Sequence, residues 1–95
     1  MSQKSSKKTK RPARQTIPTL ETLLGQYVRE RRKELGLRQI DLEGDHDMDR
    51  TYISKLENGQ FQPCLRALFH LEHVLKLSPG DLFKILHARM NTPDA

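Results

Sequence analysis

The chain has 95 residues, 35% of them apolar and 31% charged, and a formal net charge of +5. This length suits one small domain, and the apolar stretches are too often interrupted by charge to form a membrane span or a secretory signal. A single cysteine, Cys64, excludes an internal disulfide, so we expect a cytoplasmic protein whose stability does not depend on oxidation.

The excess positive charge lies at the N-terminus. Residues 1–16 hold six basic side chains and no acid, a charge of +6, whereas the rest of the chain holds eleven basic and twelve acidic side chains, a charge of −1. Residues 1–18 also have too few apolar side chains to offset their ordering entropy, which predicts a disordered basic arm. It is either a solubilising tail or a non-specific DNA arm that uses Lys7, Lys8, Lys10, Arg11 and Arg14.

The first two predicted helices follow this arm. Thr19 can cap a helix in which apolar residues recur at helical spacing as far as Gly36, which supplies a left-handed stop. A shorter segment of weak helix propensity runs from Leu37 to about Gly44 and gives way to an acidic turn at residues 45–47.

The third predicted helix is short and has one polar face. Asp49 caps it, and the Asn58-Gly59 pair ends it. Ile53 and Leu56 face the core, which leaves a polar face of Arg50, Thr51, Ser54 and Lys55. Two short helices joined by a tight turn match the helix-turn-helix arrangement, whose second helix enters the major groove of DNA.

Two further helices complete the predicted fold. Pro63 opens a helix with a wide apolar stripe that ends near Lys76, and the run 78–81 combines a cap, a proline and an acid that mark another helix start. No strand pattern and no repeat is detectable. We therefore predict an all-α fold, a compact five-helix DNA-binding domain over residues 19–90, with a short flexible C-terminus at 91–95.

One set of motif residues extends over most of this domain: Arg32, Leu35-Gly36-Leu37, Gln39, Leu42, the run 50–59, Pro63 and the run 75–78. In this order and spacing, residues 24–83 resemble the lambda repressor and Cro (XRE-type) family of helix-turn-helix transcriptional regulators. The resemblance implies a lambda repressor-like domain that binds double-stranded DNA. The residues themselves indicate no membrane segment and no small-molecule substrate. Among such regulators, the run 49–54 resembles restriction-modification controllers slightly more than phage switches or antitoxins.

The resemblance also implies roles for individual residues. The family's base-contacting positions correspond to Arg50, Thr51, Ser54 and Lys55. Its phosphate-contacting positions correspond to Gln39, Tyr52 and Asn58. A structural pair that joins the first helix to the recognition helix corresponds to Arg32 and Glu57. Because arginine favours the O6 and N7 atoms of guanine, we expect a guanine near Arg50.

The chain departs from the family in its charge. Arg38 and Glu43 stand where the family usually has small residues, and Asp45, Asp47 and Asp49 bring acid near the expected DNA face, which should repel phosphate unless these side chains point away. These departures leave an alternative open. The chain could be a protein-interaction module or antitoxin-like partner that keeps the fold and binds DNA weakly or without specificity.

Other chemistry has little support in the sequence. His70, His73 and Cys64 match a metal site only loosely, and His46 between two aspartates is similarly weak. No phosphate loop, nucleophile elbow or acid–base pair can be assembled. We expect no metal, no cofactor and no enzymatic activity.

A single short recognition helix covers few base pairs, which predicts a homodimer on a pseudo-palindromic operator. The dimer surface must then come from the helical body. Candidates on the fifth helix are Ile85, Leu86 and Met90. The alternative is that these three residues only complete the core.

Overall fold

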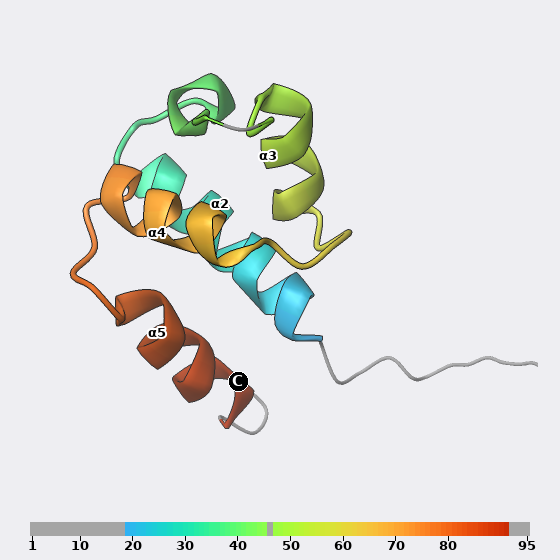
Figure 1. Ribbon diagram of the computed structural model, residues 1–95. Helices are drawn as coiled ribbons and strands as arrows, with labels where there is room; N and C mark the ends of the chain where they lie inside the picture. Colours follow the sequence, from blue (N-terminus) through green and yellow to red (C-terminus); the bar gives the residue numbers. More distant parts are fainter. Residues whose placement is uncertain (1–18, 46, 92–95) are drawn as a thin grey trace, which may run out of the picture.

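The computed structural model describes residues 19–45 and 47–91. They form four α-helices and one 3-10 helix, in the order α2 (Leu20–Glu34), η3 (Gln39–Leu42), α3 (Arg50–Glu57), α4 (Leu65–Val74) and α5 (Asp81–Met90). No strand occurs in these two segments, so the all-α prediction is confirmed for them (Figure 1). None of these helices is long and apolar enough to cross a membrane. The expected basic arm, His46 and residues 92–95 lie outside the described residues.

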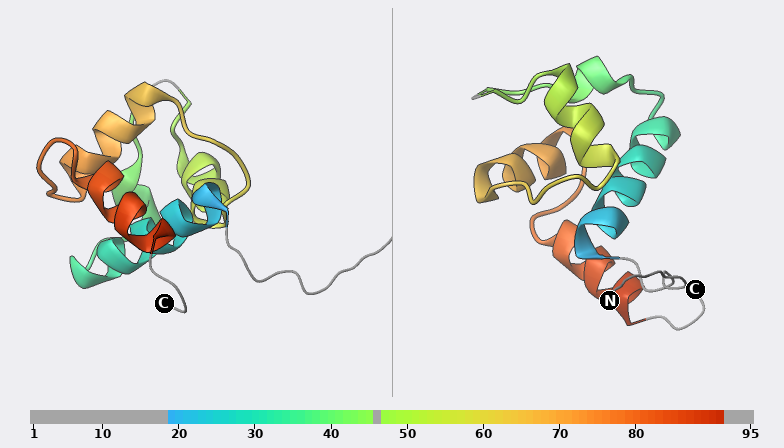
Figure 2. Two further views of the ribbon diagram at one scale, coloured as in Figure 1. Left: turned by 90° about the horizontal axis from the view of Figure 1, so that it is seen from below. Right: turned by 90° about the vertical axis from the view of Figure 1, so that its right-hand side faces the viewer.

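The helices enclose one apolar core to which every element contributes. The caps at both ends of α2 are as predicted, since Thr19 Oγ1 accepts from the backbone nitrogen of Thr22 at 3.1 Å and Gly36 has a φ of +73°. In the right-hand view of Figure 2, η3 and α3 lie in the upper part of the molecule and α5 lies at the bottom. The buried apolar residues are Leu23, Leu24, Val28, Leu42, Met48, Ile53, Leu56, Ala67, Leu71, Leu75, Leu82 and Leu86.

A glycine sets how closely α2 and α3 approach. Gly25 is buried, and a Cβ atom added to it would lie 2.5 Å from the backbone oxygen of Glu57 and 2.6 Å from that of Leu56. Only a residue without a side chain allows this backbone contact. The crossing brings the end of α3 beside the middle of α2, where Arg29 and Arg32 lie.

The predicted second helix is wrong in type and length. Instead of an α-helix over 37–44, the chain forms a single 3-10 turn over residues 39–42, and Glu43 is already extended, with a ψ of 151°. The side chain of His70, on α4, explains the early end. Its Nε2 atom lies 2.9 Å from the carbonyl oxygen of Leu42 and 3.0 Å from that of Glu43, so it occupies acceptors that a continuing helix would need.

A buried carboxylate positions α5. Glu72 Oε2 accepts from the backbone nitrogen of Leu82 at 3.0 Å, and its Oε1 accepts from that of Gly80 at 3.2 Å. These bonds satisfy backbone donors at the start of α5, which would otherwise lack partners. The helix then places Leu82 and Leu86 in the core, with exposed fractions of 1% and 6%.

Candidate nucleic-acid interface

The third helix, α3, presents its polar face outward. Asp49 Oδ1 accepts from the backbone nitrogen of Tyr52 at 2.9 Å and caps the first turn, as predicted. Because Ile53 and Leu56 are anchored in the core, the opposite side of the helix faces solvent. Of the four candidate base-contacting residues, Arg50, Thr51 and Lys55 are exposed and Ser54 is half-buried.

These four side chains line one shallow polar hollow. Two of the three candidate phosphate-contacting residues join them, and the complete lining is Gln39, Arg50, Thr51, Ser54, Lys55, Asn58 and Gln60. Gln60 was missed in the sequence. Its backbone nitrogen donates to the Lys55 carbonyl at 3.1 Å, which folds the chain back onto the end of α3. The helix-ending Asn58-Gly59 pair was the available signal, because a left-handed glycine reverses the chain direction there.

Tyr52 does not line this hollow. It is half-buried, and its ring lies 4.7 Å from that of Phe61, between centroids, with the planes inclined by 55°. Burial raises the pKa of its hydroxyl above the usual value. Tyr52 therefore packs the loop after α3 against the helix.

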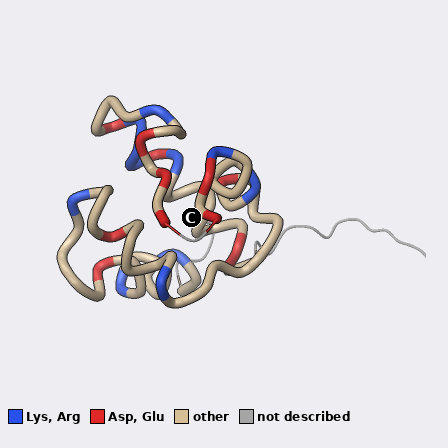
Figure 3. Tube along the Cα trace, turned by 45° about the horizontal axis from the view of Figure 1, so that its top comes forward, with Lys and Arg blue, Asp and Glu red and all other residues tan. Residues whose placement is uncertain are grey.

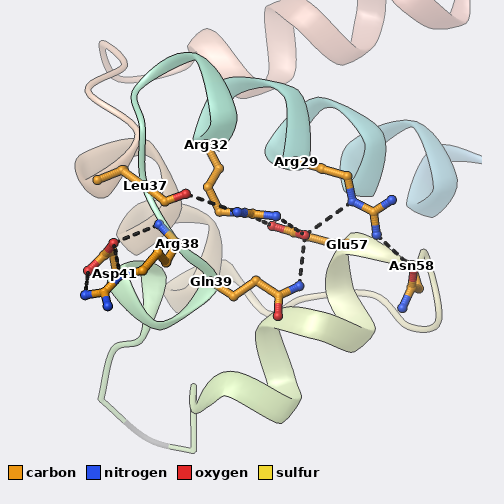
Figure 4. Close-up of polar contacts among 8 residues, drawn as sticks. All are labelled: Arg29, Arg32, Leu37, Arg38, Gln39, Asp41, Glu57 and Asn58. Atoms are coloured by element: carbon orange, nitrogen blue, oxygen red, sulfur yellow. Dashed lines mark hydrogen bonds and ion pairs between the residues drawn. The ribbon is translucent and has the colours of Figure 1, made fainter.

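Glu57 joins α3 to both neighbouring elements (Figure 4). Its side chain has no exposed area, and its Oε2 lies 2.7 Å from Arg32 Nε. Its Oε1 accepts from Arg32 Nη2 and Gln39 Nε2, each at 3.1 Å, and lies 3.4 Å from Arg29 Nε. The Glu57 carboxylate thus links α3 both to α2 and to η3, in addition to their apolar packing. Arg32 also donates to the Leu37 carbonyl at 3.0 Å, which ties in the turn before η3.

These contacts determine the ionisation of Glu57. Burial opposes its charge, but hydrogen bonds from Arg32, Gln39 and Arg29 and the positive charge of Arg32 outweigh burial and lower its pKa. Gln39 uses one amide hydrogen for this contact. Its other Nε2 hydrogen has no hydrogen-bond acceptor among the described residues.

Acidic side chains accompany the basic ones on this part of the molecule. Lys and Arg are interleaved with Asp and Glu along the trace (Figure 3). Arg38 and Asp41 pair with each other, with the Arg38 backbone nitrogen 2.7 Å and its Nε 3.4 Å from Asp41 Oδ2. The hydrogen bond from the Arg38 backbone nitrogen lowers the pKa of Asp41 most, and the hydrogen bond from the Arg38 side chain lowers it further. The remaining acids of the region are exposed, namely Glu43, Asp45, Asp47 and Asp49.

The fold and this surface define a small helix-turn-helix domain. One side of α3 packs on the core and on Glu57, and its opposite polar side is exposed. The chain belongs to the helix-turn-helix family, whose model matches residues 28–82, and this confirms the family predicted from the motif residues. It is 33% identical over 54 residues to the ImmF control region 10 kDa protein of Bacillus phage phi105. That match covers 57% of this chain and 60% of the phage protein, so it spans less than two thirds of that relative.

Solved structures share the fold. A mutant of the restriction-modification controller protein C.Esp1396I is similar with a TM-score of 0.68 and 24% identity, over 83% of this chain and 100% of that one. The clp gene regulator ClgR from C. glutamicum is similar with a TM-score of 0.68 and 25% identity. This match covers 81% of this chain and 99% of ClgR. The C.Esp1396I tetramer in complex with its natural 35 base-pair operator is similar with a TM-score of 0.65 and 25% identity. This match covers 79% of this chain and 99% of that one.

Proposed function

We propose that this protein is a sequence-specific transcriptional regulator that inserts α3 into the major groove of double-stranded DNA. The observation that carries the proposal is the exposed row of Arg50, Thr51 and Lys55 on a helix whose other side is fixed by Glu57 and the core. Rigid placement of a few donors on one helix face is what direct reading of base edges requires. The similar solved structures are regulators, one of them on its operator, which supports this function rather than catalysis.

Selection from a randomised duplex pool, followed by sequencing, tests the proposal. We expect the full chain to enrich a pseudo-palindromic motif. The competing function, a protein-interaction module with weak DNA binding, is favoured by the exposed acids around α3 and predicts no converged motif. A pool that stays random at physiological salt, where non-specific binding is weakened, would contradict sequence-specific regulation.

Arg50 should determine one base of that motif. Arg50→Ala is expected to lose the preference for guanine at that position and to weaken binding to the selected site by about 1 to 3 kcal/mol. The measurement is a repeat selection together with titration of the wild-type site. Uniform weakening on all sequences would instead place Arg50 on phosphate.

The N-terminal arm is proposed to add non-specific affinity to the domain at 19–90. Because residues 1–16 carry a charge of +6, deleting them should lower the slope of log affinity against log salt by roughly 0.9 for each phosphate that the arm had neutralised. The selected sequence should stay the same. A solubilising tail without a role in binding would leave the salt slope unchanged.

Two copies are proposed to bind together, through the end of the molecule away from α3. The three residues predicted for the dimer surface differ in exposure. Leu86 is buried, Ile85 is half-buried and Met90 is 48% exposed. Beside them an apolar groove is lined by Leu20, Glu21, Leu24, Gln62, Pro63, Leu68, Phe83 and Leu86. Two of its lining side chains are large, apolar and exposed, namely Leu20 at 49% and Phe83 at 56%.

Exposed apolar grooves can serve as protein–protein contact surfaces. Phe83→Glu should therefore shift the mass in sedimentation from dimer to monomer and weaken binding to the palindromic site. Ile40→Glu is the matched control, because Ile40 is also apolar and 48% exposed but lies on η3. A monomeric wild-type protein, or equal dissociation in both variants, would contradict this surface.

A further inference from the structure

Arg29 connects the middle of α2 to two consecutive residues at the end of α3. Its Nη2 donates to Asn58 Oδ1 at 3.1 Å, and its Nε lies 3.4 Å from Glu57 Oε1. The motif residues assign no role to Arg29. Its side chain is 45% exposed, so it reaches the surface beside the polar hollow that Asn58 helps to line.

The contact selects one of two orientations of the Asn58 amide. An asparagine amide presents an acceptor oxygen on one arm and a donor nitrogen on the other. A guanidinium only donates, so it can pair with Oδ1 and not with Nδ2. Figure 4 shows the result, with the Asn58 oxygen toward Arg29 and the nitrogen turned away from it.

This orientation is the one that a phosphate requires, because phosphate oxygens are acceptors. We propose that Arg29 is a positioning residue for DNA binding, which holds the Asn58 amide so that its Nδ2 donates to a backbone phosphate. The inference rests on the proposed DNA-binding function and adds a residue to it. With the opposite orientation, Asn58 would lose the Arg29 bond and direct its oxygen at the phosphate.

The net charge around Asn58 also favours a bound phosphate. Arg29 and Arg32 together outweigh the charge of Glu57, so the cluster behind Asn58 is net positive despite its buried carboxylate. The bridge also requires arginine specifically. A guanidinium is a planar fork that can contact Glu57 and Asn58 at once, whereas the lysine ammonium is one compact charge on a flexible stem.

The test is a double-mutant cycle in DNA affinity with Arg29→Lys and Asn58→Ala, in the full chain on the selected duplex. Each single change should weaken binding about tenfold, the loss expected for one hydrogen bond to a charged group. Arg29→Lys should then cost less than about twofold when Asn58 is already alanine, because the group it positions is absent. The salt slope should not change, since lysine keeps the charge.

A second measurement needs no DNA. Nitrogen-15 relaxation of the Asn58 side-chain amide should report an ordered group in the wild-type protein and a lower order parameter in Arg29→Lys. Arg31→Lys is the matched control on the same helix, because Arg31 Nε donates to the Leu75 carbonyl at 3.0 Å, away from the hollow. Arg31→Lys should affect neither DNA affinity nor Asn58.

Several results would overturn the role of Arg29. They are an unchanged order parameter, a full additional loss on the Asn58→Ala background, or a loss of affinity explained entirely by a lower free energy of unfolding. If the wild-type chain shows no sequence preference for DNA, the proposed function fails instead. The relaxation measurement then still decides whether Arg29 orients Asn58.

Discussion

Gly25→Ala is expected to lower the free energy of unfolding by about 3 kcal/mol, a large loss for the smallest possible side chain. The added Cβ atom would lie within 2.8 Å of three backbone atoms of Leu56 and Glu57. Backbone atoms cannot change rotamer, so α2 and α3 must separate along their crossing. Urea unfolding followed by circular dichroism measures the loss.

Gly36→Ala is the control for Gly25→Ala. Gly36 has a φ of +73°, which strains alanine, but no atom lies within 4 Å of the added Cβ. The expected cost is about 1 kcal/mol, from the backbone alone. If the two substitutions cost the same, the close contact between α2 and α3 does not exist in solution. Because α3 is the proposed reading helix, Gly25→Ala should also weaken DNA binding under conditions where the protein is still folded.

Glu57→Ala is expected to cost about 3 to 4 kcal/mol, because it leaves the largely buried Arg32 without its anion. The Arg32 side chain is only 12% exposed, and Gln39 and Arg29 lose a partner at the same time. Chemical unfolding at neutral pH measures this loss. Glu34→Ala is the control, because Glu34 lies 3.4 Å from Arg31 but is 66% exposed, and such surface pairs contribute about 1 kcal/mol at most.

The contribution of Glu57 should depend on pH in a defined direction. Its pKa in the folded protein is lowered from 4.5, so ionised Glu57 favours the folded state. The stabilisation is complete above the unfolded pKa and is lost as the pH falls through the folded pKa. Glu57→Gln should therefore reduce the difference in stability between neutral and acidic solution. An identical pH profile for both proteins would show that folding does not lower the pKa of Glu57.

The outward polar face of α3 could largely be predicted from local sequence. Asp49, the apolar pair Ile53 and Leu56, and the Asn58-Gly59 stop lie within one short helix and its caps. Their spacing alone determines which side of α3 is buried and which side carries Arg50 and Lys55. The family resemblance added the expected roles, because its motif spans most of the described domain.

The expectations that failed depended on residues far apart in the chain. The second helix is a 3-10 turn because His70, 28 positions after Leu42, contacts its last carbonyl groups. Leu86 is 6% exposed and belongs to the core of its own chain, as the alternative interpretation of the fifth helix had it, whereas the dimer itself stays a prediction. Periodicity identifies an apolar face but does not show whether the same chain or a second copy covers it.

The sequence by itself determined the family, through a motif that spans residues 24–83. It also determined the caps of α2 and α3 and the outward face of α3, because these depend on residues within about two turns of one another. The predicted starts of the last two helices were wrong, since α4 begins after Cys64 and α5 after Gly80, neither with a side-chain cap. Only the tertiary structure decided how α3 is held. The contact of Gly25 with α3 and the convergence of Arg29, Arg32 and Gln39 on Glu57 join residues between 18 and 32 positions apart. Contacts of this range form when helices pack, and no local pattern encodes which donor will reach which acceptor.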